Sequence, residues 1–151
     1  MNRWLTLGAN LGVLVGIILL LVELNQNREM MRAQIRNDIA TQEVQRMENI
    51  ISNAEIADLL VRDQNGDQLS PGEEMRIRFR RYGSFRSWEN VHYQYKLGLF
   101  DEAEYMGSRE AWKSIMSNRR SYVRHWCEFR LQTSVDFRSE LDSLIKGLDC
   151  S

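Results

Sequence analysis

The feature that most constrains this chain is an apolar segment near its N-terminus, from Trp4 to Leu24. Fifteen of its 21 residues are Trp, Leu, Val, Ile or Ala, and its only charged residue is Glu23, next to the end. As a helix this segment rises about 30 Å, which is the thickness of the hydrocarbon core of a bilayer. Trp4 suits one membrane interface, and the polar residues after Leu24 suit the other. The segment predicts a membrane-spanning helix.

Two other interpretations of this segment are a cleaved secretory signal and a buried helix of a soluble protein. The apolar stretch is longer than the usual core of a signal peptide, and Val22-Glu23-Leu24-Asn25 offers no small-residue cleavage site. Nothing downstream is apolar enough to cover it as a soluble core helix. We therefore expect residues 1–24 to form an uncleaved anchor.

The charges on either side of the span predict its orientation. Arg3 precedes it, whereas Arg28, Arg32 and Arg36 follow it closely. Because cytoplasmic flanks carry the excess of Lys and Arg, we expect a single-pass protein with its N-terminus outside and its C-terminal domain in the cytoplasm.

Three glycines repeat at four-residue spacing inside the span. Gly8, Gly12 and Gly16 share one helix face, where a second backbone can approach closely, and Asn10 adds an amide that prefers a partner in lipid. These four residues predict helix packing, with another copy or with another membrane protein. The alternative is that glycine is simply common in membrane helices and needs no partner.

The remainder of the chain reads as entirely helical. Residues 25–51 contain no Gly or Pro and carry apolar residues at steps of three to four, which predicts an amphipathic helix continuing from the span. Residues 52–151 predict a small bundle of about four to five helices. Their strongest start signal is Ser70-Pro71-Gly72-Glu73, with Ser as N-cap, Pro at the first helical position and Glu at the third. Asp101 and Ser134 are further expected N-caps, and Ser134 begins a helix expected over residues 135–146. The predicted fold class is all-α.

The overall composition excludes several classes of protein. The net charge is −1, with 20 basic against 21 acidic residues, so a chain built for nucleic acid is not expected. Two cysteines, Cys127 and Cys150, cannot form a disulfide scaffold; interpreted as unpaired, they agree with a reducing compartment.

The central sequence also resembles a known family. Trp88-Glu89-Asn90, Tyr93-Gln94, Gly98-Leu99 and Asp101 are similar to the signature W-E-N-x-x-Y-Q-x-x-x-G-L-x-D of a family of small uncharacterised bacterial single-pass membrane-anchored α-helical proteins. The residues around the span resemble the start of that family as well. The resemblance implies an anchored helical protein of a bacterial inner membrane and brings no catalytic residues.

An arginine-rich stretch is a candidate binding surface. The stretch from Met75 to Arg86 has no acidic residue and interleaves arginines with Phe79, Tyr82 and Phe85. Contacts with anionic lipid or with an acidic partner would use Arg76, Arg78, Arg80, Arg81 and Arg86. The alternative is an ordinary helix with its aromatic residues in the core and its arginines paired with acids.

The candidates for metal binding are weak. Glu89 and His92 share a helix face, and His125 and Glu128 form a reversed copy of that spacing, which together would give a metal site or a buried polar network. A calcium loop beginning at Asp63 lacks the glycine required at its sixth position, which is Gln68, and a polar turn explains it equally well. No nucleophile has a base beside it in sequence, and no glycine-rich phosphate loop is present.

These observations predict a membrane-anchored interaction or scaffold protein that associates with itself or with a membrane partner and has no cofactor. The alternative is a membrane-tethered metal-binding protein or metalloenzyme using the Glu/His cluster.

Overall fold

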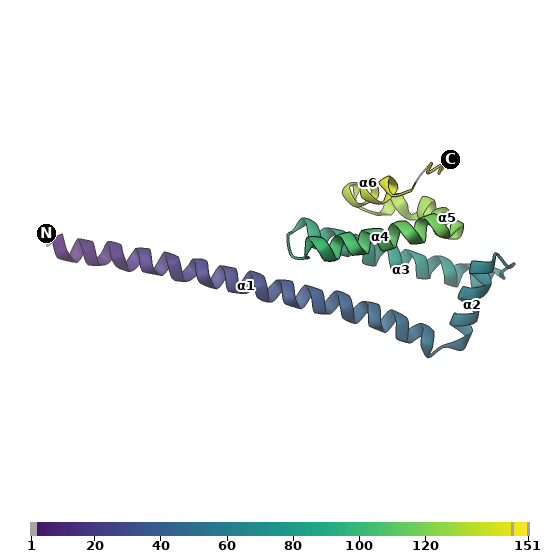
Figure 1. Ribbon diagram of the computed structural model, residues 1–151, viewed down its shortest axis with the longest axis horizontal. Coiled ribbons are helices and arrows are strands. Elements are labelled where there is room, and N and C mark those ends of the chain that lie inside the picture. Colours follow the sequence, from purple (N-terminus) through teal and green to yellow (C-terminus); the bar gives the residue numbers. More distant parts are fainter. Residues whose placement is uncertain (1–2, 146, 151) are drawn as a thin grey trace.

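The structure, a computed structural model, describes residues 3–145 and 147–150. Helices α1 to α6 and one 3₁₀ turn make up its secondary structure, and no strand occurs among the described residues. The all-α fold class is confirmed. α1 (Arg3–Ile51) is a single helix of 49 residues, so the apolar segment and the amphipathic segment after it are continuous. Its first half projects away from the rest of the molecule, as Figure 1 shows.

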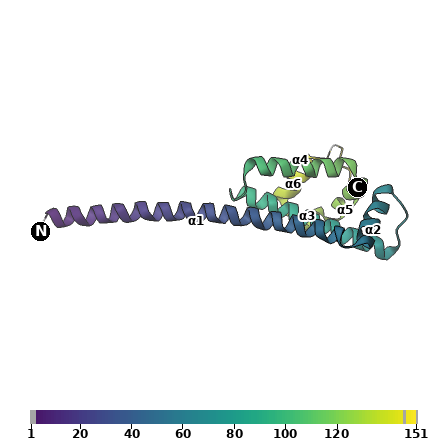
Figure 2. The same ribbon diagram turned by 60° about the horizontal axis from the view of Figure 1, so that its bottom comes forward.

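The bundle beside the second half of α1 consists of α2 (Ala54–Asn65), α3 (Pro71–Lys96), α4 (Glu102–Asn118), α5 (Arg120–Phe129) and α6 (Val135–Ser143). After Ile51 the chain reverses direction, and α3 returns alongside α1 toward the apolar first half of that helix (Figure 2). A 3₁₀ turn (Arg130–Gln132) ends α5. The helix expected over residues 135–146 stops at Ser143, and Lys146 lies outside the described residues.

The helix starts expected from the sequence have the capping bonds that define them. The Ser70 hydroxyl accepts from the Glu73 backbone N–H at 3.4 Å, while the Glu73 carboxylate accepts from the Ser70 N–H at 2.7 Å. This reciprocal pair begins α3, directly before Pro71. The Asp101 carboxylate accepts from the Ala103 and Glu104 N–H groups at the start of α4, and the Ser134 hydroxyl accepts from the Phe137 N–H at the start of α6. These local bonds fix where the helices of the bundle begin. We call residues 25–51, the second half of α1, the stalk.

The core of the bundle is largely aromatic. Phe85, Trp126, Phe137 and Leu141 are completely buried, each with 0% exposure. Edge-to-face and stacked pairs connect α3, α4, α5 and α6 through this core, and such pairs add to the stabilisation from burying the rings. The aromatic residues of the C-terminal half therefore hold the helices together.

The cysteines differ from the expectation. Cys127 on α5 and Cys150 near the C-terminus form a disulfide with their Cα atoms 5.2 Å apart, and neither thiol is free. The interpretation of both as unpaired was wrong. The fold explains the pairing, because the chain after α6 returns to α5 and brings together two residues 23 positions apart.

Candidate interaction sites

Most of the arginines on α3 have acidic partners. Four of the five candidate arginines form ion pairs, and these pairs extend to α2, to α5 and along α3 itself. The pairs are Arg76 with Glu55, Arg78 with Glu128, Arg81 with Asp63, and Arg86 with Glu89. The acids come from distant parts of the sequence, apart from Glu89 on the same helix. The α3 surface is therefore not a free cationic face.

Arg81 is the most deeply buried of these arginines. Its side chain is 4% exposed and that of its partner Asp63 is 10% exposed. The guanidinium also lies 2.8 Å from Nδ1 of His125 and 4.6 Å above the ring of Tyr122. Burial and the positive charges of Arg81 and Arg124 lower the pKa of His125, so this imidazole is kept neutral. Arg81 thereby connects α2, α3 and α5.

Arg80 has a different environment. It forms no hydrogen bond or ion pair through its guanidinium with the described side chains. Burial lowers the pKa of Arg80, Tyr122 partly offsets this, and the positive charge of Arg46 on the stalk lowers the pKa further. It lines a cavity of about 520 Å³ between α1 and the bundle. Stacked Trp88 and Trp112 line the same cavity, with ring centres 5.7 Å apart. A cation beside apolar walls is the arrangement that can hold a small anion with an apolar body.

The four Glu and His candidates do not converge on one point. His92 lies 2.7 Å from the Tyr105 hydroxyl and 3.1 Å from the Asp136 carboxylate, whereas His125 faces Arg81. Their acidic counterparts are engaged elsewhere: Glu89 accepts from the Ser134 N–H and from Arg86, and Glu128 accepts from the Tyr82 hydroxyl. Among the described residues no group of three or more His, Cys, Asp or Glu side chains could hold a metal ion. The arrangement is that of two separate polar networks between helices.

The glycine face of the apolar first half of α1 has no partner among the described residues. A Cβ built on Gly8, Gly12 or Gly16 would meet nothing within 4 Å. Asn10, between them, is exposed in the single chain. The fold of this chain therefore gives no packing reason for these glycines.

A contact between the stalk and the α3–α4 corner, residues 96–104, was not foreseen from the sequence. Arg32 donates through Nε to the Gly98 carbonyl at 3.0 Å, and Arg36 pairs with Glu104 at 2.7 Å. A Cβ on Gly98 would lie 2.9 Å from Nη2 of Arg28. These three arginines, which we name the arginine clamp, are four residues apart and so share one face of α1. This four-residue spacing was the signal in the sequence that could have indicated a shared contact face on α1.

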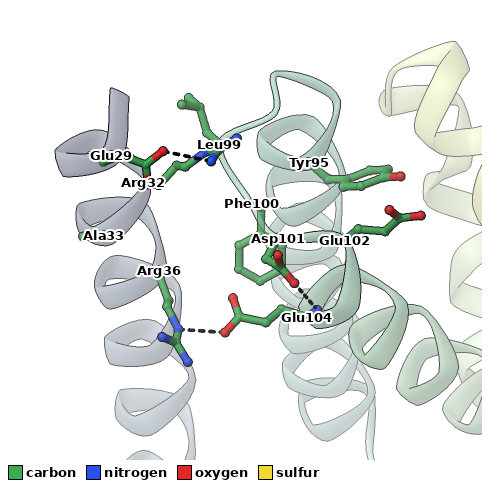
Figure 3. A pocket seen from close by; sticks show the side chains of 10 residues that line it. All are labelled: Glu29, Arg32, Ala33, Arg36, Tyr95, Leu99, Phe100, Asp101, Glu102 and Glu104. Carbon is green, nitrogen blue, oxygen red and sulfur yellow. Dashed lines mark hydrogen bonds and ion pairs between the residues drawn. The ribbon is translucent and has the colours of Figure 1, made fainter. Parts of the chain in front are cut away.

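Beside the clamp the helices are separated by a polar hollow of about 600 Å³. Figure 3 shows Arg36 of the stalk reaching across to Glu104, and Leu99 at the end of the hollow level with Glu29. In the same view the Asp101 carboxylate accepts from the Glu104 N–H at the start of α4. At the clamp, stalk and bundle are joined through guanidinium groups, whereas farther along α1 Ile39 packs against the hydrophobic core of the bundle.

The geometry also explains much of the central sequence signature. Trp88 is buried in the core, Glu89 accepts from the N–H of Ser134, the residue that precedes α6, and Asp101 caps α4. Gly98 has φ +68°, a conformation that favours glycine, and it turns the chain between α3 and α4. The described roles of these residues are structural.

Comparison of the chain with protein-family models, with curated protein sequences and with solved structures found no match. The family resemblance of the signature stays a prediction, and the assignment of function depends on the geometry of this molecule.

Proposed function

We propose that this chain is a single-pass membrane-anchored interaction or scaffold protein. Its span associates with a second copy or with another membrane protein, and its bundle is held beside the membrane by the stalk. The proposal includes no catalytic residue, cofactor or nucleic-acid partner. The near-equal numbers of acids and bases, and the ion pairs of the α3 arginines, support the exclusion of nucleic acid.

The anchor is supported by its length, its composition and its exposure. Within the described residues α1 is the one helix long and apolar enough to cross a membrane, and none of its most apolar 18 residues is buried in the molecule. Leucines and valines along the first half of α1 are about half exposed or more. An exposed apolar surface of this length is stable in lipid and not in water.

The observation that carries the association is the empty glycine face. Glycine lowers helix stability in water and is favoured where two backbones approach closely. Three glycines in register, with open space over each one and with Asn10 between them, fit a second helix packed against this face. Self-association is the simplest source of that helix, because an identical chain presents an identical face.

The test is Gly12→Leu in the full chain, reconstituted in liposomes and treated with a cross-linker. The leucine side chain separates the two backbones, so we expect cross-linked oligomers to decrease several-fold. The matched control is Leu14→Phe, which adds bulk about 200° away around the helix and should leave the oligomers in place. Equal cross-linking of the two variants would contradict a glycine-mediated contact.

The orientation of the span has two opposing indications. The three arginines of the clamp follow the span and favour a cytoplasmic bundle. They exceed the positive charges before the span, Arg3 and the N-terminal amine, by a small margin. The Cys127–Cys150 disulfide supports the opposite side, because disulfides persist in oxidising compartments. We give the disulfide more weight and propose a bundle on the oxidising side, which in a bacterial inner membrane is the periplasm.

A C-terminal fusion tests this orientation without relying on the thiols. Alkaline phosphatase after Ser151 folds only outside the cytoplasm, whereas green fluorescent protein at the same position fluoresces efficiently in the cytoplasm. We expect active phosphatase and dark green fluorescent protein in intact cells. The reverse pair of results would restore the cytoplasmic orientation that the flanking charges predict.

A further inference from the structure

The α3–α4 corner, residues 96–104, lies close to the predicted membrane boundary. α1 is one continuous helix, so the position of any residue along it gives a distance from the end of the span. Arg28 and Arg32 follow Leu24 by four and eight residues, which is about 6 and 12 Å of helix. The headgroup zone on each side of a bilayer is roughly 5–8 Å thick. The clamp therefore begins within that zone.

The corner is held at the level of the first part of the clamp. The Gly98 carbonyl accepts from Arg32, and the Gly98 backbone lies against Arg28. Figure 3 shows Leu99 beside Glu29 and Arg32, at the end of the corner farthest from Arg36. Since Arg36 lies farther from the span than Glu29 along α1, the Leu99 end of the corner is the end nearest the span.

The side chains at this corner include apolar groups that the bundle leaves in solvent. Leu97, which ends α3, is 50% exposed, and Leu99 is only partly buried. The charged side chains around them are balanced, with four basic and four acidic residues in the ranges 28–36 and 96–104. Within the corner Phe100 packs against the hydrophobic core of the bundle, so the apolar surface left in solvent belongs to Leu97 and Leu99. The region has no net charge to attract anionic lipid. Shallow burial of leucine in the interface would remove this apolar surface from water.

We propose that the α3–α4 corner is a second membrane contact, in which Leu97 and Leu99 enter the lipid interface beside the span. The proposal rests on the proposed anchor. The partner is the bilayer surface itself, recognised through apolar burial rather than through headgroup charge. The contact fixes the bundle against the membrane at two points, the span and the corner, and so prevents it from swinging about the stalk.

The test places a fluorophore at single engineered cysteines, which is possible because both native cysteines are in the disulfide. The variants are Leu99→Cys, Leu97→Cys, Leu14→Cys in the middle of the span, and Ser117→Cys near the far end of α4. Each full-length protein is labelled with a nitrobenzoxadiazole dye and reconstituted in phosphatidylcholine nanodiscs. Quenching by lipids with a doxyl group at carbon 5 or carbon 12 then measures the depth of the dye.

We expect a dye at position 99 or 97 to be quenched more by the carbon-5 lipid than by the carbon-12 lipid, and the dye at position 14 to show the reverse order. The dye at 117 should be unquenched by both. Replacing a third of the lipid with phosphatidylglycerol should change quenching at the corner by less than about a fifth, because the region is neutral.

The outcomes separate the two proposals. If position 14 is quenched while 97 and 99 behave like 117, the corner contact is overturned and the anchor stands. If position 14 is also unquenched, the anchor and the corner contact both fail. Strong dependence on phosphatidylglycerol would overturn the apolar mechanism. Having two corner positions guards against one variant that fails to fold, which circular dichroism detects.

Discussion

The substitution that most directly tests the packing of the bundle is Arg81→Met. The methionine keeps much of the buried volume and removes the guanidinium that faces Asp63 and His125. The Asp63 carboxylate, only 10% exposed, then loses its ion-pair partner. Removing one partner of a buried pair costs about 3–5 kcal/mol, because the remaining charge is uncompensated. For a bundle of this size, such a loss lowers the unfolding temperature by more than about 10 °C.

The assay is thermal and urea unfolding of the full chain in detergent micelles, followed by circular dichroism. The double variant Asp63→Asn with Arg81→Met removes the orphaned charge, so we expect it to lose clearly less stability than the sum of the two single variants. Arg78→Met is the matched control. Its pair with Glu128 spans 3.4 Å between side chains 46% and 39% exposed, so its loss should stay below about 1 kcal/mol.

Two results would refute this reasoning. Arg81→Met could lose no more stability than Arg78→Met, which would mean that the buried pair is not maintained in solution. Alternatively, the two single losses could simply add in the double variant, which would mean that Arg81 and Asp63 act independently.

Two further predictions concern single residues of the same structure. Burial and the charge of Arg81 lower the pKa of His125 from 6.5, so the imidazole binds a proton more readily in the unfolded chain than in the folded one. The free energy of unfolding should therefore fall as the pH drops below about 6.5. In urea unfolding between about pH 7.5 and 5 we expect His125→Gln to be less pH-sensitive than the parent chain, and an unchanged pH profile would contradict this. Gly98→Ala should destabilise the chain by about 1–2 kcal/mol, because φ at Gly98 is +68° and the new Cβ would lie 2.9 Å from Nη2 of Arg28. Adding Arg28→Ala to this variant should recover the part of the loss that comes from the contact. If Gly98→Ala alone is as stable as the parent chain or more stable, the backbone of the corner is not held in this conformation.

Local signals predicted much of the fold. The apolar run gave the first half of α1, and Ser70, Pro71 and Glu73 gave the start of α3, because both depend on residues that are near one another in sequence. The end of α6 was less predictable. Ser143 ends this helix three residues before the position expected, and helix ends are determined partly by tertiary contacts.

The candidate sites were predictable only as residue types. The arginines of α3 are visible in the sequence, yet which are neutralised depends on acids up to 50 positions away, such as Glu128 and Asp63. The disulfide follows from the way the chain returns after α6, and two cysteines alone do not indicate whether they meet. The arginine clamp is a third long-range feature, since Arg32 meets Gly98 across 66 positions.

The 66 positions between Arg32 and Gly98 also separate the synthesis of these two residues in time. Ribosomes add roughly 5–20 residues per second, so Arg32 is made about 3–13 seconds before Gly98. In the membrane-anchored arrangement proposed above, the anchor would enter the bilayer during this interval, before the corner that contacts the stalk has been synthesised. The bundle would then be completed on a helix already held in the membrane. Neighbouring nascent anchors would be able to meet through their glycine faces before either bundle exists, so assembly in the membrane would precede folding outside it.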